Sequence, residues 1–137
     1  MQPHARMGWT AVHTLARMTY EANITIYHNP RCSNSRGVLE LLRSRGVEPA
    51  VVEYLKTPLD AAQLTALVAR LGVPVRALMR SKEDAYHTLG LGDAQRSDAE
   101  LIAAMAAHPE LLNRPIVVTP RGAALCRPPE RVLDLLP

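Results

Sequence analysis

The sequence contains no phenylalanine, few aromatic residues, two lysines and two cysteines. Each of these low counts limits the kinds of core, binding surface or site that the protein can have. Aromatic residues make up 4% of the 137 residues, so the core must be built from Leu, Val, Ile, Ala and Met. The net charge is only +3, and no basic run is interleaved with aromatic residues, which argues against a nucleic-acid-binding surface. No apolar run approaches the length that spans a bilayer. A single domain without nucleic-acid or membrane contacts is therefore expected.

The two cysteines, Cys32 and Cys126, are far apart in the sequence. Their number and spacing indicate neither a disulfide framework nor a metal site, so no metal and no tightly bound cofactor is expected. An apolar signal-peptide segment is also missing, because His13 interrupts the only candidate. Free thiols without a secretion signal are typical of the reducing cytoplasm.

The first twenty residues read as an N-terminal extension of a domain that covers residues 21–137. Between Met1 and Arg17 there are basic residues and histidines but no acid, which faintly suggests a transit peptide. The favoured alternative is a start codon assigned too early, with Met18 as the true beginning. The segment is expected to be disordered or loosely docked.

Local patterns predict an alternating series of strands and helices. Residues 24–28 and 50–54 are rich in β-branched residues and predict strands, and a helix over 33–45, ended by Gly46, connects them. Further helices are predicted from Thr57-Pro58 to Gly72, over 75–80 and 83–89, from Ser97 to about 107, and over 130–136; a hairpin is predicted over 116–126. This order predicts an α/β fold, a thioredoxin-like mixed four-stranded sheet with flanking helices and a helical insert.

Cys32 is the residue most suited to chemistry, because it lies between the first predicted strand and the first predicted helix. A helix N-terminus offers free N–H groups and a favourable dipole to a thiolate, and the same groups bind a tetrahedral oxyanion. Ser33 and Ser35 could donate hydroxyl hydrogen bonds to the sulfur, and Arg36 adds positive potential. For Cys126, inside an apolar strand, the interpretation as a buried and inert cysteine is preferred.

The motif around the nucleophile is C-x-x-S, because Ser35 stands where a dithiol motif has its second cysteine. A mixed disulfide on Cys32 would therefore have to be resolved by an external thiol such as glutathione. Val38 stands at the arginine position of a C-x₅-R loop, which argues against the phosphatase-type fold. His28 could stabilise the thiolate or shuttle a proton, and a purely structural role is an equal alternative.

Several separated motifs in order resemble the glutaredoxin-linked arsenate reductases. These are HNPRCSNSR at 28–36, VRALMR at 75–80, NRPIVVT at 113–119 and LCRP at 125–128. The resemblance implies Cys32 as the nucleophile, Arg80, Arg114 and Arg127 as oxyanion-binding arginines, and a His28 that helps to keep the thiolate charged. It implies arsenate as substrate, with glutathione and glutaredoxin as electron donors. Arg114-Pro115 precedes the third strand, where a thioredoxin-like fold usually carries a cis-proline.

Two alternatives remain beside this resemblance. The first is a glutathione-dependent thiol reductase of unknown substrate, although such relatives tend to lack the LCRP segment. The second is a non-catalytic thioredoxin-fold regulator that binds RNA polymerase, although those proteins usually carry C-x-x-C. One departure from the arsenate reductases also stands, since Ser33 and Asn34 occupy positions where many relatives have Gly and Thr.

Overall fold

The computed structural model describes residues 23–137, so the expectations for the N-terminal extension lie outside the described residues. The elements run in the order β1 (Thr25–His28), α2 (Ser33–Ser44), β2 (Ala50–Glu53), α3 (Ala61–Leu71), η1 (Val75–Leu78), α4 (Asp84–Thr88), α5 (Asp98–Ala107), η2 (Pro109–Leu111), β3 (Ile116–Thr119), β4 (Gly122–Leu125) and η3 (Pro129–Leu135). All predicted strands and helices are present, and η2 is an additional 3₁₀ turn that the sequence patterns did not predict.

The four strands form one mixed sheet in the order β2-β1-β3-β4, which confirms the predicted fold. β1 and β2 are parallel, and the β1–β3 and β3–β4 pairs are antiparallel. Tyr27 pairs with Ile116, which in turn pairs with Leu125. The last residues of β1 and β4 and the first residues of β3 therefore lie at one end of the sheet, here called the site end.

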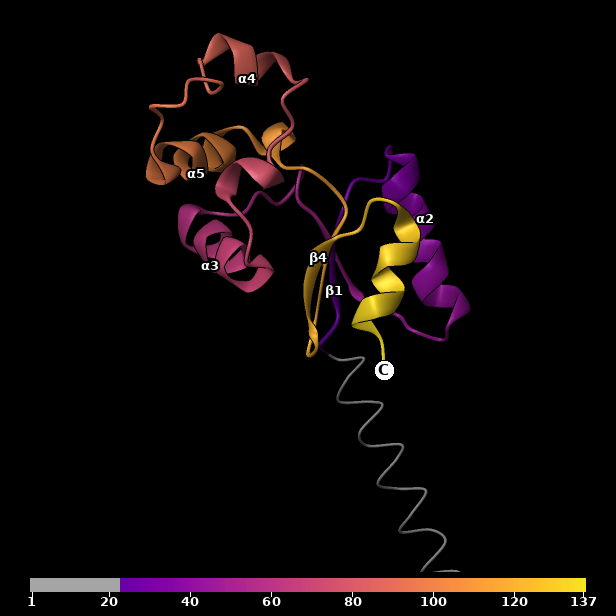
Figure 1. Cartoon of the computed structure of the whole chain (residues 1–137). Coiled ribbons are helices and arrows are strands. Elements are labelled where there is room, and N and C mark those ends of the chain that lie inside the picture. Colours follow the sequence, from indigo (N-terminus) through magenta and orange to yellow (C-terminus); the bar gives the residue numbers. More distant parts are fainter. Residues whose placement is uncertain (1–22) are drawn as a thin grey trace, which may run out of the picture.

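Helices cover both faces of this sheet (Figure 1). Ile26 and Val117, which are paired across β1 and β3, face a core cluster formed with α2 and η3. Tyr27 and Ile116, the next pair, face the opposite cluster formed with α3, η1 and α5. This alternation follows from the two-residue period of a strand, and it places α2 on a different face from the helical insert.

The helix boundaries follow the capping chemistry of the sequence. α3 begins after Asp60, whose side chain accepts the Gln63 N–H in a capping box, so the predicted start at Thr57-Pro58 was too early. The helix ends at Gly72, which adopts the left-handed conformation expected of a C-terminal glycine (φ 65°). The predicted Ser97–Glu100 capping box of α5 is confirmed.

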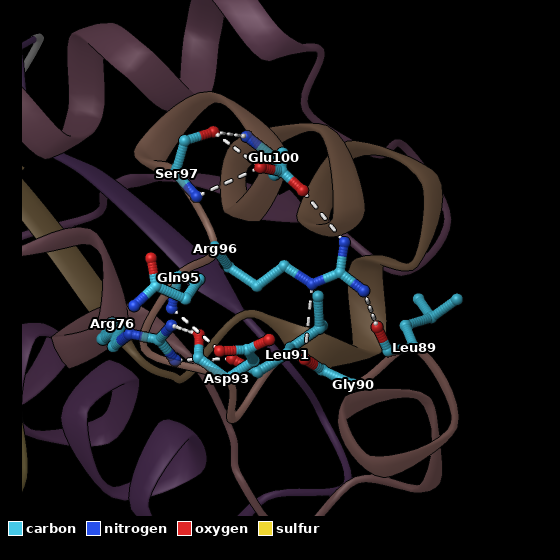
Figure 2. Close-up of polar contacts among 9 residues, drawn as sticks. All are labelled: Arg76, Leu89, Gly90, Leu91, Asp93, Gln95, Arg96, Ser97 and Glu100. Carbon is cyan, nitrogen blue, oxygen red and sulfur yellow. Dashed lines mark hydrogen bonds and ion pairs between the residues drawn. The ribbon is translucent and has the colours of Figure 1, made fainter.

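Two arginines hold the helical insert together (Figure 2). Arg76, in η1, donates to the backbone carbonyl oxygens of Leu91 and Asp93. Arg96 donates to the Leu89 carbonyl at 2.8 Å and forms an ion pair with Glu100 at 2.9 Å. Residues 92–100 are all exposed, so polar crosslinks rather than apolar burial fix this part of the chain against η1.

Two cis proline bonds lie beside the sheet, one before β3 and one after β4. Arg114–Pro115 is cis, as predicted, and Arg127–Pro128 is cis as well. The closing helix η3 is a 3₁₀ helix that begins at Pro129, one residue before the predicted start. Proline fits the first turn of a helix because its missing N–H would have no partner there.

Candidate active site

The site end of the sheet gathers segments that are far apart in the sequence. Cys32 follows β1, Arg114 precedes β3, and Arg127 follows β4. The segment after η1 joins them through an antiparallel bridge between Met79 and Leu112 and an Arg80 N–H that donates to the Leu111 carbonyl at 2.8 Å. The sheet and this bridge therefore bring Cys32 and the three predicted arginines to one end of the sheet.

Cys32 is the N-cap residue of α2, and its thiol is partly exposed. Its backbone N–H donates to the Asn29 carbonyl at 3.0 Å, and its carbonyl accepts the Arg36 N–H at 3.0 Å. Burial raises the pKa of the thiol, but hydrogen bonds from the Ser35 and Asn34 N–H groups and from the Arg114 side chain outweigh it. The pKa of Cys32 is consequently lowered, which favours the nucleophilic thiolate.

Arg127 lies against the sulfur. Its Nη1 is 3.9 Å from the Cys32 Sγ and donates to the Arg114 carbonyl at 3.0 Å. With the Asn34 amide oxygen turned toward it, both terminal nitrogens of Arg127 also donate to that oxygen at 3.2 Å. The exposed guanidinium is thus anchored beside the nucleophile and keeps part of its surface open to solvent.

Arg114 has an unusual environment for an arginine. It both hydrogen-bonds and attracts the Cys32 thiolate, while its buried Nε has no hydrogen-bond partner among the described residues. A buried donor without a partner costs free energy, so the arrangement is typical of a site that an anion completes.

Arg80 is positioned by an acidic neighbour. Its Nε donates to Glu83 Oε1 at 2.9 Å, and both side chains are largely shielded from solvent. One edge of the guanidinium is therefore fixed, which leaves its terminal nitrogens for a ligand. Arg80 and Arg127 line the same cleft of ≈ 220 Å³.

Tyr54 shows that the site is compact. Its side chain is buried just after β2, and its hydroxyl donates to the Leu112 carbonyl at 3.4 Å. Burial raises the pKa of Tyr54, and the charges of Arg114, Arg80 and Cys32 all act on it. The predicted nucleophile and two of the predicted arginines thus lie within electrostatic range of one buried phenol.

His28 reaches the nucleophile through Ser35 rather than through the sulfur. Its Nδ1 is 2.6 Å from the Ser35 Oγ, and this hydroxyl also accepts the Asn29 N–H at 3.0 Å. The Ser35 hydroxyl thus contacts His28 and the Asn29 N–H, and the predicted hydroxyl hydrogen bond to Cys32 is replaced by one from the Ser35 backbone N–H. Burial lowers the pKa of His28, and Arg43 and Arg36 lower it further against the opposing effect of Glu53.

The other two residues predicted to stabilise the thiolate lie apart from the sulfur. Ser33 is the exposed first residue of α2. Arg36 is exposed as well and donates to the Pro30 carbonyl at 3.0 Å, which closes the loop before the helix. Neither side chain is among the described contacts of the Cys32 sulfur, and the cations that do contact it are Arg114 and Arg127.

Four residues of the site were missed in the sequence: Asn29, Asn34, Tyr54 and Glu83. Asn29 could have been found from the sequence, because asparagine is typical of an Asx turn, and here its Oδ1 accepts the N–H of Arg31 two residues later. Glu83 could have been found as well, since it stands three residues after Arg80. Asn34 and Tyr54 act on partners far along the chain, and no local pattern indicates them.

Cys126 is fully buried between β4 and η3, as predicted. Burial raises the pKa of its thiol to about 12. This cysteine therefore stays protonated near neutral pH and takes no part in the site.

Neither a cluster of possible metal ligands nor a membrane-spanning helix is found within residues 23–137. No three histidine, cysteine or acidic side chains in this range gather in a way that could hold a metal ion. In the same range no helix combines the length and apolar character that a bilayer requires.

Comparison with known proteins places this site in a family. Residues 27–135 match the ArsC family. The arsenate reductase of Rhizobium meliloti (strain 1021) is 54% identical over 114 residues, which cover 83% of this chain and 81% of that protein. The uncharacterized protein YfgD of Escherichia coli (strain K12) is 53% identical over 114 residues, which cover 82% and 96% of the two chains.

Solved structures agree with the sequence comparison. An arsenate reductase from Vibrio cholerae superposes with a TM-score of 0.81 at 50% identity, and the match covers 84% of this chain and 99% of that one. Since the arsenate reductase of Rhizobium meliloti and YfgD match this chain with nearly equal identity, the reaction has to be argued from the site.

Proposed function

This chain belongs to the ArsC family, and from that premise we propose that it reduces arsenate to arsenite with Cys32 as the nucleophile and with glutathione and glutaredoxin as electron donors. One observation carries the proposal. A thiol of lowered pKa lies at a helix N-terminus beside Arg114 and Arg127, and a buried donor of Arg114 has no partner within residues 23–137. Such a site is suited to a tetrahedral oxyanion that the thiolate then attacks.

Binding of arsenate is assigned to the arginines. Arg114 and Arg127 contact the sulfur, and Arg80 lines the cleft that Arg127 also lines. Guanidinium groups donate in pairs to oxyanions, so they neutralise the charge that would otherwise repel the thiolate. Phosphate has nearly the same shape and charge, and therefore selection must come from the chemical step, because arsenic accepts a thiolate and is reducible.

The first chemical step is substitution at arsenic. The Cys32 thiolate forms a sulfur–arsenic bond, an arsenic–oxygen bond breaks, and the oxygen leaves as water after protonation. Arsenic remains As(V) in this adduct. The lowered pKa of Cys32 supplies the thiolate near neutral pH, and Arg114 holds its charge until the attack.

Reduction follows when a second thiol attacks. The glutathione thiolate forms a disulfide with the Cys32 sulfur, and the electron pair of the sulfur–arsenic bond moves onto arsenic, which leaves as arsenite, As(III). A glutaredoxin thiolate then attacks the glutathione sulfur and releases Cys32 as thiolate. The two electrons come from two sulfurs, so the proposed reaction needs neither a metal nor a tightly bound cofactor, and the reducing cytoplasm supplies its thiols.

A second candidate is a glutathione-dependent thiol reductase with another substrate. The match to the uncharacterized protein YfgD covers 96% of that protein and is nearly as strong as the match to an arsenate reductase, so it leaves the substrate open. The Cys32 environment would serve such an enzyme equally well. The two candidates differ in whether arsenate is consumed.

The test is arsenate-dependent NADPH oxidation in an assay coupled through glutaredoxin, glutathione and glutathione reductase. We expect turnover with arsenate, none with phosphate, and none in the Cys32→Ser variant. Absence of arsenate-dependent turnover in the unmodified protein would refute the arsenate reductase assignment and favour the second candidate.

A further inference from the structure

A second anion site lies beside the nucleophile. We propose that the cleft next to Arg127 binds a carboxylate of the attacking thiol, and that Lys82 thereby selects an anionic thiol such as glutathione over a neutral one. This inference rests on the proposed function, because it assigns the place of the second substrate.

The cleft is linked to the Cys32 sulfur through Arg127. It is lined by Met79, Arg80, Ser81, Lys82, Asn113 and Arg127. Arg127 belongs to both places, since its Nη1 is 3.9 Å from the Cys32 Sγ while its side chain forms one wall of the cleft. A molecule bound in the cleft would therefore contact the same guanidinium that contacts the Cys32 sulfur.

The charge of the cleft is positive and mostly uncompensated. Glu83 pairs with Arg80, but within residues 23–137 neither Lys82 nor Arg127 forms an ion pair with an acidic side chain. Lys82 is exposed and adds a mobile point charge to the guanidiniums. Three cationic side chains against one acid favour an anionic ligand.

Polar groups complete the cleft. Asn113 Oδ1 accepts the Arg114 N–H at 3.0 Å, so its amide NH₂ group remains to donate to a ligand. The Ser81 hydroxyl adds a second neutral donor. Ammonium, amide and hydroxyl donors in one wall match the oxygen atoms of a carboxylate.

The size of the cleft limits what it can hold. Its volume of ≈ 220 Å³ is below the roughly 300 Å³ at which sites for whole drug-sized ligands begin. It therefore suits one end of a tripeptide thiol and not the whole molecule, and the thiol itself can extend past Arg127 toward Cys32. Arsenate needs less space and has Arg114 and Arg127 at the sulfur.

The experiment is an NMR titration of the full chain with S-methylglutathione, which carries the carboxylates of glutathione but cannot react. The unmodified protein is compared with Lys82→Gln, Lys82→Glu and the matched control Lys56→Gln. Lys56 is a suitable control because its exposed side chain pairs with Glu53 outside the cleft. This measurement needs no arsenate and so does not depend on turnover.

We expect shifts of the Ser81, Lys82 and Asn113 amide signals, and a Kd that rises about 3-fold in Lys82→Gln, as for an exposed ion pair, and further in Lys82→Glu. The control should bind like the unmodified protein, and high salt should reduce the difference between variants. Shifts confined to other amides, or an unchanged Kd in Lys82→Glu, would overturn the proposal.

Kinetics separate this proposal from the proposed function. In the arsenate assay, Lys82→Glu should raise the KM for glutathione and leave the KM for arsenate unchanged. With 2-mercaptoethanol as the only thiol, the variant and the unmodified protein should react alike. An arsenate KM that rises instead would assign Lys82 to the arsenate site and contradict the inference, whereas a protein that binds S-methylglutathione but never reduces arsenate would contradict only the proposed function.

Discussion

Cys32 and Cys126 lie at the same end of the same sheet, one after β1 and the other after β4, and yet their thiols have opposite properties. At Cys32, two backbone N–H groups and Arg114 outweigh burial and lower the pKa. At Cys126, burial among Ile26, Val117 and Val132 raises the pKa to about 12. The surroundings therefore decide which thiol is a nucleophile.

The same contrast between core and site holds for two residues that are adjacent in the sequence, Cys126 and Arg127. Cys126 is buried in the core on the α2 face, whereas the next residue, Arg127, is exposed and reaches the Cys32 sulfur. The two residues that directly follow β4 therefore serve the core and the site, respectively. A substitution in the core should accordingly affect mainly stability, and one in the site mainly activity.

The largest effect is expected at the nucleophile. Cys32→Ser replaces a thiolate by a hydroxyl that is not ionised near neutral pH, so arsenate-dependent NADPH oxidation should fall to background. The fold should be retained, since the Cys32 side chain makes no capping hydrogen bond. A variant with more than a few per cent of the original rate would contradict the assignment.

A smaller effect is expected when Arg114 is replaced by Ala. The variant loses both an oxyanion donor and a group that lowers the pKa of Cys32, so kcat/KM for arsenate should fall about 100-fold and the Cys32 pKa should rise. Steady-state kinetics and thiol titration measure the two effects. Arg45→Ala, at an exposed position after α2, is the matched control and should keep the original values.

Ser35→Ala should affect stability more than chemistry. The backbone N–H that bonds Cys32 remains, but His28 and the Asn29 N–H both lose their buried partner. We expect a loss of about 1–3 kcal/mol in the free energy of unfolding and only a few-fold change in turnover. Urea denaturation together with the coupled assay checks this, and a loss of turnover as large as in Arg114→Ala would mean that the hydroxyl acts on the sulfur directly.

The smallest effect on turnover is expected at Cys126. Cys126→Ala should keep the rate within about two-fold, because the thiol is protonated and enclosed, and the small cavity should lower stability by about 1 kcal/mol. Thermal unfolding and the coupled assay measure both. A strong loss of turnover without a loss of stability would show that the two cysteines act together.

Local sequence signals predicted the fold and singled out Cys32, whereas the three site arginines were predicted from the family resemblance. The alternation in β1, the Ser97–Glu100 capping box and Gly72 are local, and each was confirmed. The placement of Cys32 directly before a helix is also a local signal, and the structure confirms this position. The cis bond at Arg114–Pro115 followed from the predicted fold rather than from the dipeptide.

What could not be predicted depends on contacts between distant segments. The hydrogen bond of Ser35 to His28, the contact of Arg127 with Asn34 and the position of Tyr54 all require the folded sheet. The same holds for Arg76, whose bonds to the carbonyl groups of Leu91 and Asp93 cross the insert. The residue type alone does not determine the hydrogen-bond partner, because a serine hydroxyl can bond either to a sulfur or to an imidazole.

The most direct test of the account is the pH dependence of alkylation of the two cysteines in the native protein, followed by peptide mass spectrometry. Cys32 should react with iodoacetamide at a rate that rises with pH and reaches a plateau below the pH expected for an ordinary thiol, while Cys126 reacts only after unfolding. Equal reactivity of the two thiols would contradict the central claim, and so would a Cys32 profile like that of a free cysteine. The claim is that the surroundings at the site end lower the pKa of Cys32, whereas burial in the core raises the pKa of Cys126 and makes it unreactive.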